Sequence, residues 1–420
     1  MMNQAPAGTE RGLPSIARRT VLGAITGGIA GLMLPKRVSA KAATTGMAFD
    51  QWMTTFRTRA EARGITTETY ARVMRTVRPD MGVLEAIRNQ PEFNIQLWQY
   101  LNRVTSDWKI AAGKEKAKQY AALFERIEKD FGVEPSIMLG VWGIESAFGD
   151  PIVAKNHMKP VFSSLATLAW GEPRRRAYWD SELINALTIV QRGWSTPEEM
   201  VGSWAGAMGH TQWMPEVWLH VGMDYNGDGK ISPFGPPDDA LGSTARYFVE
   251  RGKYRRGEHW GYEVRVPHGV RGGSHSYTEW QKLGVHRADG EPYPQPNVTA
   301  RLWIPVPGGP AFLVGANFFA VKSYNPSMNY ALALCHLGDR CVGGEPFVQK
   351  FPGGEPAPTL SDIQEIQRRL SALGYAIGEA DGRIGAATSI AVRDYQRKIG
   401  MAPADGYAGV GLLARLRQGS

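Results

Sequence analysis

Cysteine is scarce in this sequence of 420 residues, which contains two, Cys335 and Cys341. They lie close together in the chain, so in an oxidising compartment they could form a disulfide; two free thiols are the alternative. A zinc-finger, RNA-binding or other nucleic-acid module is also missing. The net charge of +8 therefore indicates only an anionic partner, such as nucleic acid, anionic lipid or a bacterial wall polymer.

The first forty residues lack a hydrophobic run that could span a bilayer comfortably. The apolar stretch Thr20 to Leu34 is short and rich in glycine, Arg18 and Arg19 precede it, and Val38-Ser39-Ala40 offers a small-residue cleavage site. This resembles a twin-arginine export signal, which predicts a signal peptide over 1–40 and a mature protein in the periplasm. An uncleaved amphipathic anchor is disfavoured because the segment has no polar face. A lipoprotein anchor is excluded because no cysteine lies near the cleavage site.

The stretch Glu134 to Gly149 places a carboxylic acid where an ordinary surface helix would not keep one. Pro135 suits a first helical position, and Gly149 supplies a stop. At helical spacing Glu145 shares its side with four apolar residues, Met138, Val141, Trp142 and Phe148. Burial and the negative end of the helix dipole should both raise the pKa of Glu145, which suits a general acid. The alternative is a glutamate at the edge of the stripe that reaches solvent.

Two further segments carry side chains suited to a sugar polymer. Three arginines stand between Pro173 and Tyr178; they are either a solvated face or a rim of bidentate donors beside a stacking tyrosine. The run Gly202 to Pro215 combines small residues with the pair Gln212-Trp213, an amide beside an indole. Such a pair suits sugars, whose hydroxyls need hydrogen bonds and whose ring faces need a flat surface. A tightly packed helix pair would show the same small residues.

The segment Asp224 to Ser232 matches the first half of a calcium-binding loop. Side chains with oxygen stand at the first, third and fifth positions, glycine at the sixth and an apolar residue at the eighth. The match fails at the twelfth position, where Gly235 replaces the expected glutamate. Asp238 or Asp239 could close the site after a longer excursion, and the alternative is a glycine-rich Asx turn that binds no ion.

The hydrophobic pattern divides the rest of the chain into three parts. Residues 41–343 are helical at first and contain short strand-like pieces after Arg251. Residues 344–359 are rich in glycine and proline and are predicted to be a linker. Residues 360–420 form a separate unit in which Ala-Asp-Gly-x-x-Gly occurs twice, at 380–385 and 404–409, which indicates an internal duplication of a turn and a helix.

Several motifs occur in an order that resembles the lytic murein transglycosylase B family. They are Glu145-Ser146, Pro173 to Arg175, Gly202 to Pro215, the calcium-like loop with Asp239 to Ser243 after it, and Tyr324-Asn325 to Tyr330. The C-terminal unit resembles the three-helix peptidoglycan-binding domain often appended to wall enzymes. The resemblance implies a mainly α, lysozyme-like catalytic core with small β-containing insertions, followed by a separate three-helix domain.

The resemblance also implies roles for individual residues. Glu145 would be the sole catalytic acid and base, and Ser203 would hydrogen-bond and orient it. The glycan groove would be lined by Tyr100, Arg174, Arg175, Tyr178, Gln212, Trp213, Tyr247, Tyr324, Asn325 and Tyr330, with Trp213 where the family often has phenylalanine. No cofactor is required; a structural calcium ion would be held by Asp224, Asn226, Asp228, the carbonyl of Lys230 and Asp239, although Asp239 follows an extra residue.

The activity that this family implies is cleavage of peptidoglycan glycan strands between N-acetylmuramic acid and N-acetylglucosamine. The product is a 1,6-anhydro sugar, and water is not consumed. Cell-wall synthesis or division proteins are further candidate partners, while nucleic acid and a stable membrane anchor are not expected. A muramidase that uses water would need a second carboxylate facing Glu145, and Asp150, Glu172 and Asp180 lie in no apolar setting. An inert wall-binding scaffold would need the aromatic residues but not the acid.

Overall fold

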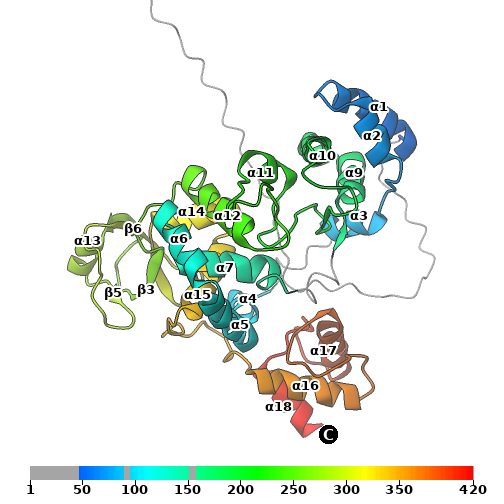
Figure 1. The fold of residues 1–420 in the computed structure, drawn as a ribbon. Helices are drawn as coiled ribbons and strands as arrows, with labels where there is room; N and C mark the ends of the chain where they lie inside the picture. The colour runs from blue at the N-terminus through cyan, green and yellow to red at the C-terminus, as the bar shows by residue number, and fades with distance from the viewer. Residues whose placement is uncertain (1–46, 89–94, 151–157, 420) are drawn as a thin grey trace, which may run out of the picture.

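The computed structural model describes residues 47–88, 95–150 and 158–419. The predicted signal peptide lies outside these residues. Helices dominate the described part of the chain, which confirms the mainly α prediction, and its apolar side chains form four separate hydrophobic cores (Figure 1). None of the described helices is both long enough and apolar enough to cross a membrane.

One helical lobe, here called the outer lobe, carries the three arginines and Tyr178. Its core contains Trp52, Phe56 and Trp179 with the apolar side of the helix that begins at Val161. Two short antiparallel strands pair Lys159 with Gly202 and join the lobe to the glycine-rich run. Its elements are α1 (Phe49–Glu61), α2 (Thr67–Met74), α3 (Met81–Arg88), β1 (Lys159–Pro160), α9 (Val161–Gly171), the 3-10 helix η2 (Pro173–Arg175), α10 (Arg176–Gln191), β2 (Val201–Gly202) and α11 (Pro215–His220).

The largest core belongs to a central bundle that surrounds the Glu145 helix. Every residue from Ser136 to Glu145 is buried, so this helix is enclosed on all sides instead of being amphipathic. The bundle consists of α4 (Leu97–Val104), α5 (Asp107–Gln119), α6 (Ala121–Phe131), α7 (Pro135–Ser146), α12 (Asp238–Glu250), α14 (Ala316–Tyr324) and α15 (Met328–Cys341).

Glycines let α7 and α15 approach each other closely. A Cβ atom on Gly338 would lie 1.9 Å from the carbonyl oxygen of Ser136, and one on Gly140 would lie 2.3 Å from that of Leu334. Because Ser136 meets Gly338 and Gly140 meets Leu334, the two helices run antiparallel. The last turn of α7 therefore meets the first turn of α15, which brings Glu145 to Tyr330.

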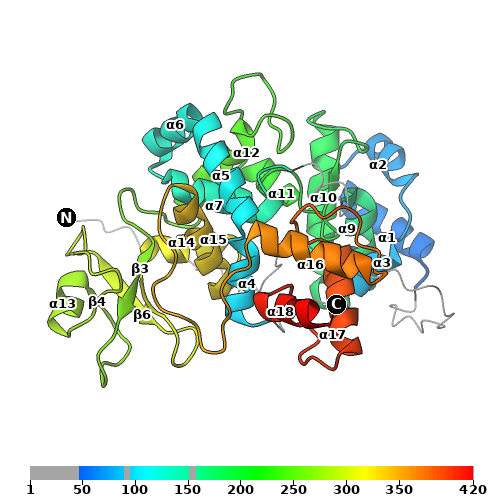
Figure 2. The ribbon, with the colours of Figure 1, turned by 90° about the horizontal axis from the view of Figure 1, so that it is seen from below.

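A five-stranded antiparallel sheet forms the β-containing insertion and lies beside the central bundle (Figures 1 and 2). Its strand order is β4-β6-β7-β3-β5, and Val264 pairs with both Ala311 and Arg287. The elements of this insertion are β3 (Gly261–Arg265), β4 (Ser274–Ser276), α13 (Tyr277–Lys282), β5 (His286–Arg287), β6 (Thr299–Trp303) and β7 (Ala311–Val314).

The C-terminal unit has its own core and consists of α16 (Leu360–Ala372), α17 (Ala386–Lys398) and α18 (Val410–Gln418). The segment predicted as a linker, 344–359, contains no helix or strand. It is nevertheless fastened to the sheet, because the backbone N–H groups of Val348 and Gln349 donate to the carboxylate of Glu263 at 2.7 and 2.8 Å. These bonds attach the segment to β3 at residues 348 and 349.

The two cysteines lie on α15 as buried free thiols. Of the two alternatives for Cys335 and Cys341, the structure therefore contains the unpaired one. Burial raises the pKa of the Cys341 thiol to about 12, so the thiol stays protonated and unreactive at neutral pH.

Candidate active site

Glu145 lies in the last turn of α7 with 3% of its surface exposed. Burial raises its pKa from 4.5 to about 8, and a hydrogen bond from Tyr330 acts in the opposite direction. The carboxyl group is therefore protonated at neutral pH. The alternative of a solvent-reaching glutamate at the edge of the helix is wrong for this structure.

The chain reverses sharply after Glu145 and fixes the end of the helix. Ala147 and Phe148 both adopt left-handed backbone angles, with φ of 50° and 64°, and the N–H of Phe148 donates to the carbonyl of Trp142 at 3.1 Å. Ser146 Oγ donates to the carbonyl of His210 at 2.6 Å. The acid is thus held against the glycine-rich run by the residue next to it.

Tyr330 is the side chain that hydrogen-bonds the catalytic candidate. Its hydroxyl donates to Oε1 of Glu145, and its own pKa is raised well above 10 by burial and by the neighbouring carboxylate. Tyr330 is 3% exposed and lies in the first turn of α15, where the side chain of Ser327 accepts from its backbone N–H at 3.2 Å. We predicted Tyr330 as a groove residue, and the structure instead places it directly on the acid.

Ser203 occupies a different place from the one expected. Its Oγ accepts from the N–H of Ala207 at 3.1 Å, and its backbone N–H donates to the carbonyl of the same residue at 2.8 Å. These bonds close the turn from Ser203 to Ala207. Among the described residues the hydrogen-bond partner of Glu145 is Tyr330, so the predicted contact between Ser203 and Glu145 is not present in this conformation.

The glycine-rich run brings backbone segments into close contact, as its small residues predict. A Cβ atom on Gly209 would lie 2.1 Å from the carbonyl oxygen of Pro233. Gln212 has a φ of 54°, and its Oε1 is buried without a hydrogen-bond partner while its Nε2 donates to the carbonyl of Gly209 at 2.9 Å. An unpartnered acceptor at such a site is a candidate to receive a hydrogen bond from a ligand.

Trp213 does not face a groove in this structure. Its ring is completely buried in the core of the outer lobe, and Nε1 donates to Oγ1 of Thr244 at 3.3 Å. A ring covered on both faces by protein cannot stack on a sugar, so the predicted stacking role of Trp213 is wrong for this conformation. Its place in a turn beside Gln212 misled the prediction, because adjacent residues in a tight turn point in different directions.

Three other predicted groove residues gather near the Glu145–Tyr330 pair. Tyr324 donates its hydroxyl hydrogen to the carbonyl of Thr211, and its pKa is raised by burial and then by Glu145. Tyr247 meets Tyr324 edge to face, with ring centroids 5.1 Å apart, and donates to the carbonyl of Ser323 at 3.1 Å. Tyr100, on α4, is among the groups that raise the pKa of Tyr330.

Asn325 supplies a second unpartnered polar atom. It is 2% exposed; its Oδ1 accepts from the N–H of Ser327 at 3.2 Å, and its Nδ2 is buried without a partner. With Oε1 of Gln212 it provides one free donor and one free acceptor, which are the groups that an acetamido or hydroxyl group requires.

The arginine-rich segment forms a separate patch on the outer lobe. The Arg175 guanidinium lies 4.5 Å from the ring centroid of Tyr178 and 5.1 Å from that of Trp179, while Arg174 is exposed. The segment is thus in part a solvated face and in part a cation stacked on an aromatic ring.

Sequence reasoning missed two groups, the half-buried His210 and the buried Glu182. His210 Nδ1 accepts from Nε1 of Trp142 at 3.1 Å and Nε2 lies 2.7 Å from the carbonyl of Gly235, so the ring is neutral, and burial lowers its pKa. Burial raises the pKa of Glu182 to about 7, and its Oε2 accepts from the N–H of Glu216 at 3.0 Å. A histidine within a glycine-rich run was an available signal, whereas nothing in the sequence around Glu182 marked it.

The calcium-like loop is closed by hydrogen bonds of its own. The Asp224 carboxylate accepts from the N–H groups of Gly227, Asp228 and Gly229 at 2.7, 3.1 and 2.8 Å. Oδ1 of Asn226 accepts from the N–H of Asp228 at 2.9 Å, and Oδ1 of Asp228 accepts from that of Lys230 at 2.9 Å. This is the pattern of successive Asx turns.

Asp239 does not stand free as a closing ligand. Its Oδ1 accepts from Tyr225 and Asn226, and its Oδ2 accepts from the N–H of Ser232 at 3.0 Å. Within the described residues no three acidic, histidine or cysteine side chains come together as a metal site. The five predicted ligands therefore fit a complete calcium site poorly, because both oxygens of Asp239 already hold the loop.

Comparison with known proteins agrees with this geometry. Residues 48–339 match the family described as Transglycosylase SLT domain. The chain belongs to this family. A peptidoglycan binding domain matches residues 359–416, so the transglycosylase domain is followed by a second family domain.

The chain is similar to proteins from two bacteria. Membrane-bound lytic murein transglycosylase B of Escherichia coli (strain K12) is 30% identical over 226 residues, which span 52% of this chain and 60% of that protein. SltB3 from Pseudomonas aeruginosa, solved in complex with NAG-anhNAM-pentapeptide, is 38% identical with a TM-score of 0.68, and the match covers 89% of this chain and all of the solved chain.

A second solved transglycosylase structure shares the fold. The Escherichia coli enzyme Slt35, solved in complex with calcium, has a TM-score of 0.59 at 24% identity, covering 74% of this chain and 98% of that chain. At that identity the similarity shows the shared fold. The lysozyme-like helical core expected from the sequence is confirmed by these neighbours.

Proposed function

We propose that this transglycosylase cleaves the β-1,4 bond between N-acetylmuramic acid and N-acetylglucosamine in peptidoglycan, with Glu145 as acid and then as base. The observation that carries the proposal is the burial of Glu145 at 3% exposure, with a pKa of about 8. A carboxylic acid that stays protonated at neutral pH can give its proton to a leaving oxygen. The complex of SltB3 with an anhydro-muramoyl ligand supports this reaction class.

In the first step Glu145 protonates the glycosidic oxygen, and the bond from that oxygen to the anomeric carbon of the muramoyl residue breaks. Positive charge develops on the anomeric carbon. The hydroxyl of Tyr330 already donates to Oε1 of Glu145, so it stabilises the carboxylate that remains after the proton has left.

In the second step the Glu145 carboxylate removes the proton of the muramoyl C6 hydroxyl, and that oxygen attacks the anomeric carbon. The 1,6-anhydro bond forms, Glu145 is protonated again, and no water is consumed. One acid is therefore sufficient for both steps. Burial raises the pKa of Glu145 and the hydrogen bond from Tyr330 lowers it, which suits a group that first gives up a proton and then takes one back.

We further propose that Tyr100, Tyr247, Tyr324, Asn325 and Gln212 bind the sugar next to the cleaved bond, while Arg174, Arg175 and Tyr178 bind a more distant part of the strand. The free Nδ2 of Asn325 and the free Oε1 of Gln212 support the first assignment. The guanidinium stacked on Tyr178 supports the second.

The chain would act in the periplasm, exported through the signal predicted in residues 1–40, in wall remodelling or turnover. The domain at 359–416 would hold it on the glycan strands. Proteins of wall synthesis or division remain candidate partners. The mechanism requires no cofactor; a structural calcium ion at Asp224, Asn226, Asp228 and the carbonyl of Lys230 would bind weakly, since Asp239 already holds the loop.

The test is mass spectrometry of the soluble products after the mature protein digests purified sacculi, with Glu145→Gln as the control. Anhydro-muropeptides, one water lighter than their reducing counterparts and absent with the variant, are the expected result. Reducing ends would assign the protein as a muramidase instead. Sacculi that bind the protein without releasing products would favour the inert scaffold.

A further inference from the structure

The two duplicated turns of the C-terminal domain have the same internal hydrogen bonds. In the first turn, the buried Gln367 donates from Nε2 to Oδ1 of Asp381 at 3.0 Å and accepts from the N–H of Gly382 at 2.8 Å. The N–H of Arg383 donates to the same Oδ1 at 2.8 Å. A glutamine from the preceding helix thus holds this aspartate turn through two hydrogen bonds.

The second turn repeats this arrangement almost atom for atom. The buried Gln396 donates to Oδ1 of Asp405 at 3.1 Å and accepts from the N–H of Gly406 at 2.8 Å, and the N–H of Tyr407 donates to that Oδ1 at 2.9 Å. The internal bonds of Asp405 therefore use Oδ1 alone. Oδ2 remains available for a partner outside the domain.

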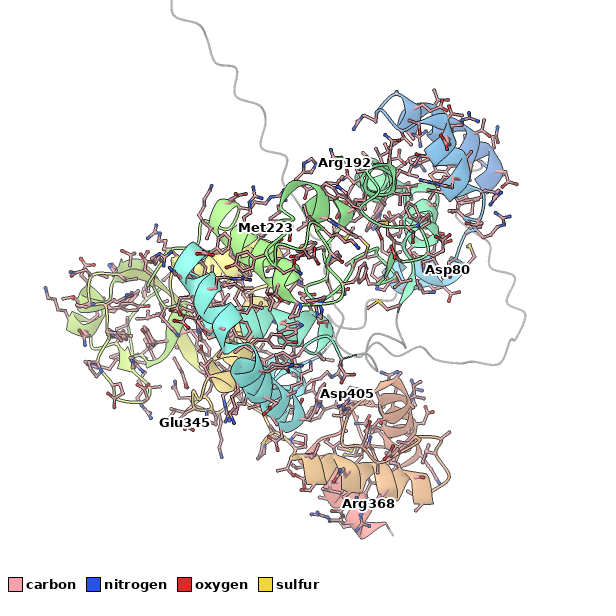
Figure 3. All side chains as sticks on the ribbon, viewed as in Figure 1. Asp80, Arg192, Met223, Glu345, Arg368 and Asp405 are labelled. Atoms are coloured by element: carbon pink, nitrogen blue, oxygen red, sulfur yellow. The ribbon has the colours of Figure 1, made fainter. Side chains whose placement is uncertain are left out.

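That partner is the catalytic part of the same chain. Gln99 Nε2, on α4, donates to Oδ2 of Asp405 at 2.6 Å. Figure 3 labels Asp405 on the side of the domain that faces the central bundle. Gln99 is 7% exposed, so this contact is shielded from water and strengthened accordingly.

In both turns the residue two places after the aspartate also contacts the catalytic part. Arg383 forms an ion pair at 2.7 Å with Asp150, which directly follows the turn that ends α7. The Arg383 guanidinium also lies 4.9 Å from the ring centroid of Trp108. Tyr407 accepts from Nδ2 of Asn102 at 3.0 Å and meets Trp98 edge to face at 5.1 Å. The two copies of the repeat thus place Arg383 and Tyr407, at the same position in each turn, against the catalytic part.

Helix α4 connects this surface to the acid. Trp98, Gln99 and Asn102 face the C-terminal domain, and Tyr100, between them, packs against the central core and helps to raise the pKa of Tyr330. Helix α4 has two turns; Leu97, Leu101 and Val104 pack into the central core, and Asn102 also donates to the carbonyl of Glu355 at 3.2 Å. Any movement of α4 would move Tyr100 relative to Glu145.

We propose that the C-terminal domain is a built-in support of the catalytic groove, with Gln99 as a positioning residue that acts through Asp405 and α4 on Tyr100. The proposal rests on the lytic transglycosylase function proposed above and extends it. The domain then contributes to cleavage of short soluble substrates, which need no anchoring to the wall.

The test is Gln99→Glu in the full chain, assayed on a soluble muropeptide tetrasaccharide. The substitution keeps the shape of the side chain and the oxygen that accepts from the N–H of Gln96 at 2.9 Å, so the start of α4 is preserved. It places a second carboxylate against Asp405. Replacing a buried charge-assisted hydrogen bond with like-charge repulsion weakens docking about tenfold or more, and we expect kcat/KM to fall by about the same factor.

The decisive variant is Gln99→Glu combined with Asp405→Asn. The new amide can donate to the new carboxylate while Oδ1 still accepts from Gln396 and Tyr407, so activity should return to near that of the wild type. Gln119→Glu, an exposed substitution of the same kind on α5, is the matched control and should leave kcat/KM unchanged. Binding to sacculi should be the same for all these proteins.

Two results would overturn the proposal. One is a wild-type kcat/KM in Gln99→Glu, and the other is an activity loss that Asp405→Asn does not restore, since the loss would then be a local effect on α4. A wild-type protein that binds sacculi but releases no anhydro product from the tetrasaccharide would overturn the proposed function itself.

Discussion

Glu145 is protonated at neutral pH because the fold hides it from water. The apolar side of α7 indicated a buried acid from the sequence, with a solvent-reaching glutamate as the alternative. The hydrogen bond from Tyr330 was not predictable, because its donor lies 185 residues further along the chain. The types of the neighbouring residues in the chain indicate that an acid is buried. Which side chain hydrogen-bonds to it is decided by tertiary packing.

The pH dependence of cleavage should report the Glu145–Tyr330 pair. The first step needs protonated Glu145, so kcat/KM should fall as pH rises through about 8. In Tyr330→Phe the carboxylate loses the donor that lowers its pKa, so this fall should move to higher pH. The same substitution should lower kcat roughly 10- to 100-fold, because a hydrogen bond to a charged group is lost.

The measurement is a pH–rate profile on the soluble tetrasaccharide, with Tyr375→Phe in the C-terminal domain as the control. A high-pH limb of Tyr330→Phe that coincides with the wild-type limb would show that Tyr330 does not act on the ionisation of Glu145.

The raised pKa of Glu145 also affects stability. In the unfolded chain the carboxyl loses its proton near pH 4.5, whereas in the folded state it keeps it until about pH 8. The free energy of unfolding therefore falls as pH rises from 4.5 to 8, and the full penalty is present above 8. Glu145→Gln removes that penalty and should raise the free energy of unfolding by roughly 2–5 kcal/mol at pH 9, with little change at pH 4.

Denaturant unfolding at the two pH values checks this prediction. An equal effect of Glu145→Gln at pH 4 and pH 9 would contradict a buried, protonated glutamate.

At the scale of elements, the contact between α7 and α15 is the one on which the site depends. Gly338→Ala places a methyl group where the carbonyl oxygen of Ser136 is 1.9 Å away, so the helices must separate. We expect a loss of about 1–3 kcal/mol in the free energy of unfolding and a fall in kcat, since Tyr330 moves away from Glu145.

Thermal and denaturant unfolding measure this effect, and Gly272→Ala is the matched control. A Cβ atom on Gly272 meets no atom within 4 Å, so its substitution should change stability by less than about 0.5 kcal/mol. Wild-type stability of Gly338→Ala would mean that the helices tolerate a wider spacing.

The stability of the calcium-like loop should depend more on the hydrogen bonds of Asp239 than on a bound ion. Asp239→Asn replaces one accepting oxygen with an N–H₂ group, so one of the backbone donors that Asp239 now accepts from loses its partner. The expected loss is about 1–3 kcal/mol in the free energy of unfolding. Melting temperatures measured in calcium and in a chelator test the loop and the ion together, with Asp50→Asn, an exposed carboxylate on α1, as the control.

A large rise in melting temperature with calcium, abolished by Asp224→Asn, would show that the loop binds the ion firmly. The Asp, Asn and Gly residues of this loop were enough to predict Asx turns as one of two alternatives. The sequence could not show that Asp239 holds the backbone, because that depends on how α12 packs against the loop.

At the scale of the whole molecule, composition and periodicity predicted a helical protein with a separate C-terminal unit. They did not predict that segment 344–359 would be fastened through Glu263, or that Asp405 would contact α4. A segment rich in glycine and proline indicates flexibility, but two backbone N–H groups aimed at one carboxylate are sufficient to hold it. Trp213 and Ser203 were misplaced for a related reason, since family resemblance gives a residue's role and not its direction in a given conformation.

The antiparallel pairing of α7 and α15 has a consequence for damaged chains. A chain cut short before Met328 keeps Glu145 but loses the helix that covers it and the hydroxyl of Tyr330. Its carboxyl group would then have an ordinary acidity and be ionised at neutral pH. Incomplete or proteolysed copies of this protein would therefore be harmless to the wall, because the proton needed for bond cleavage is present only when the last helix of the catalytic part is in place.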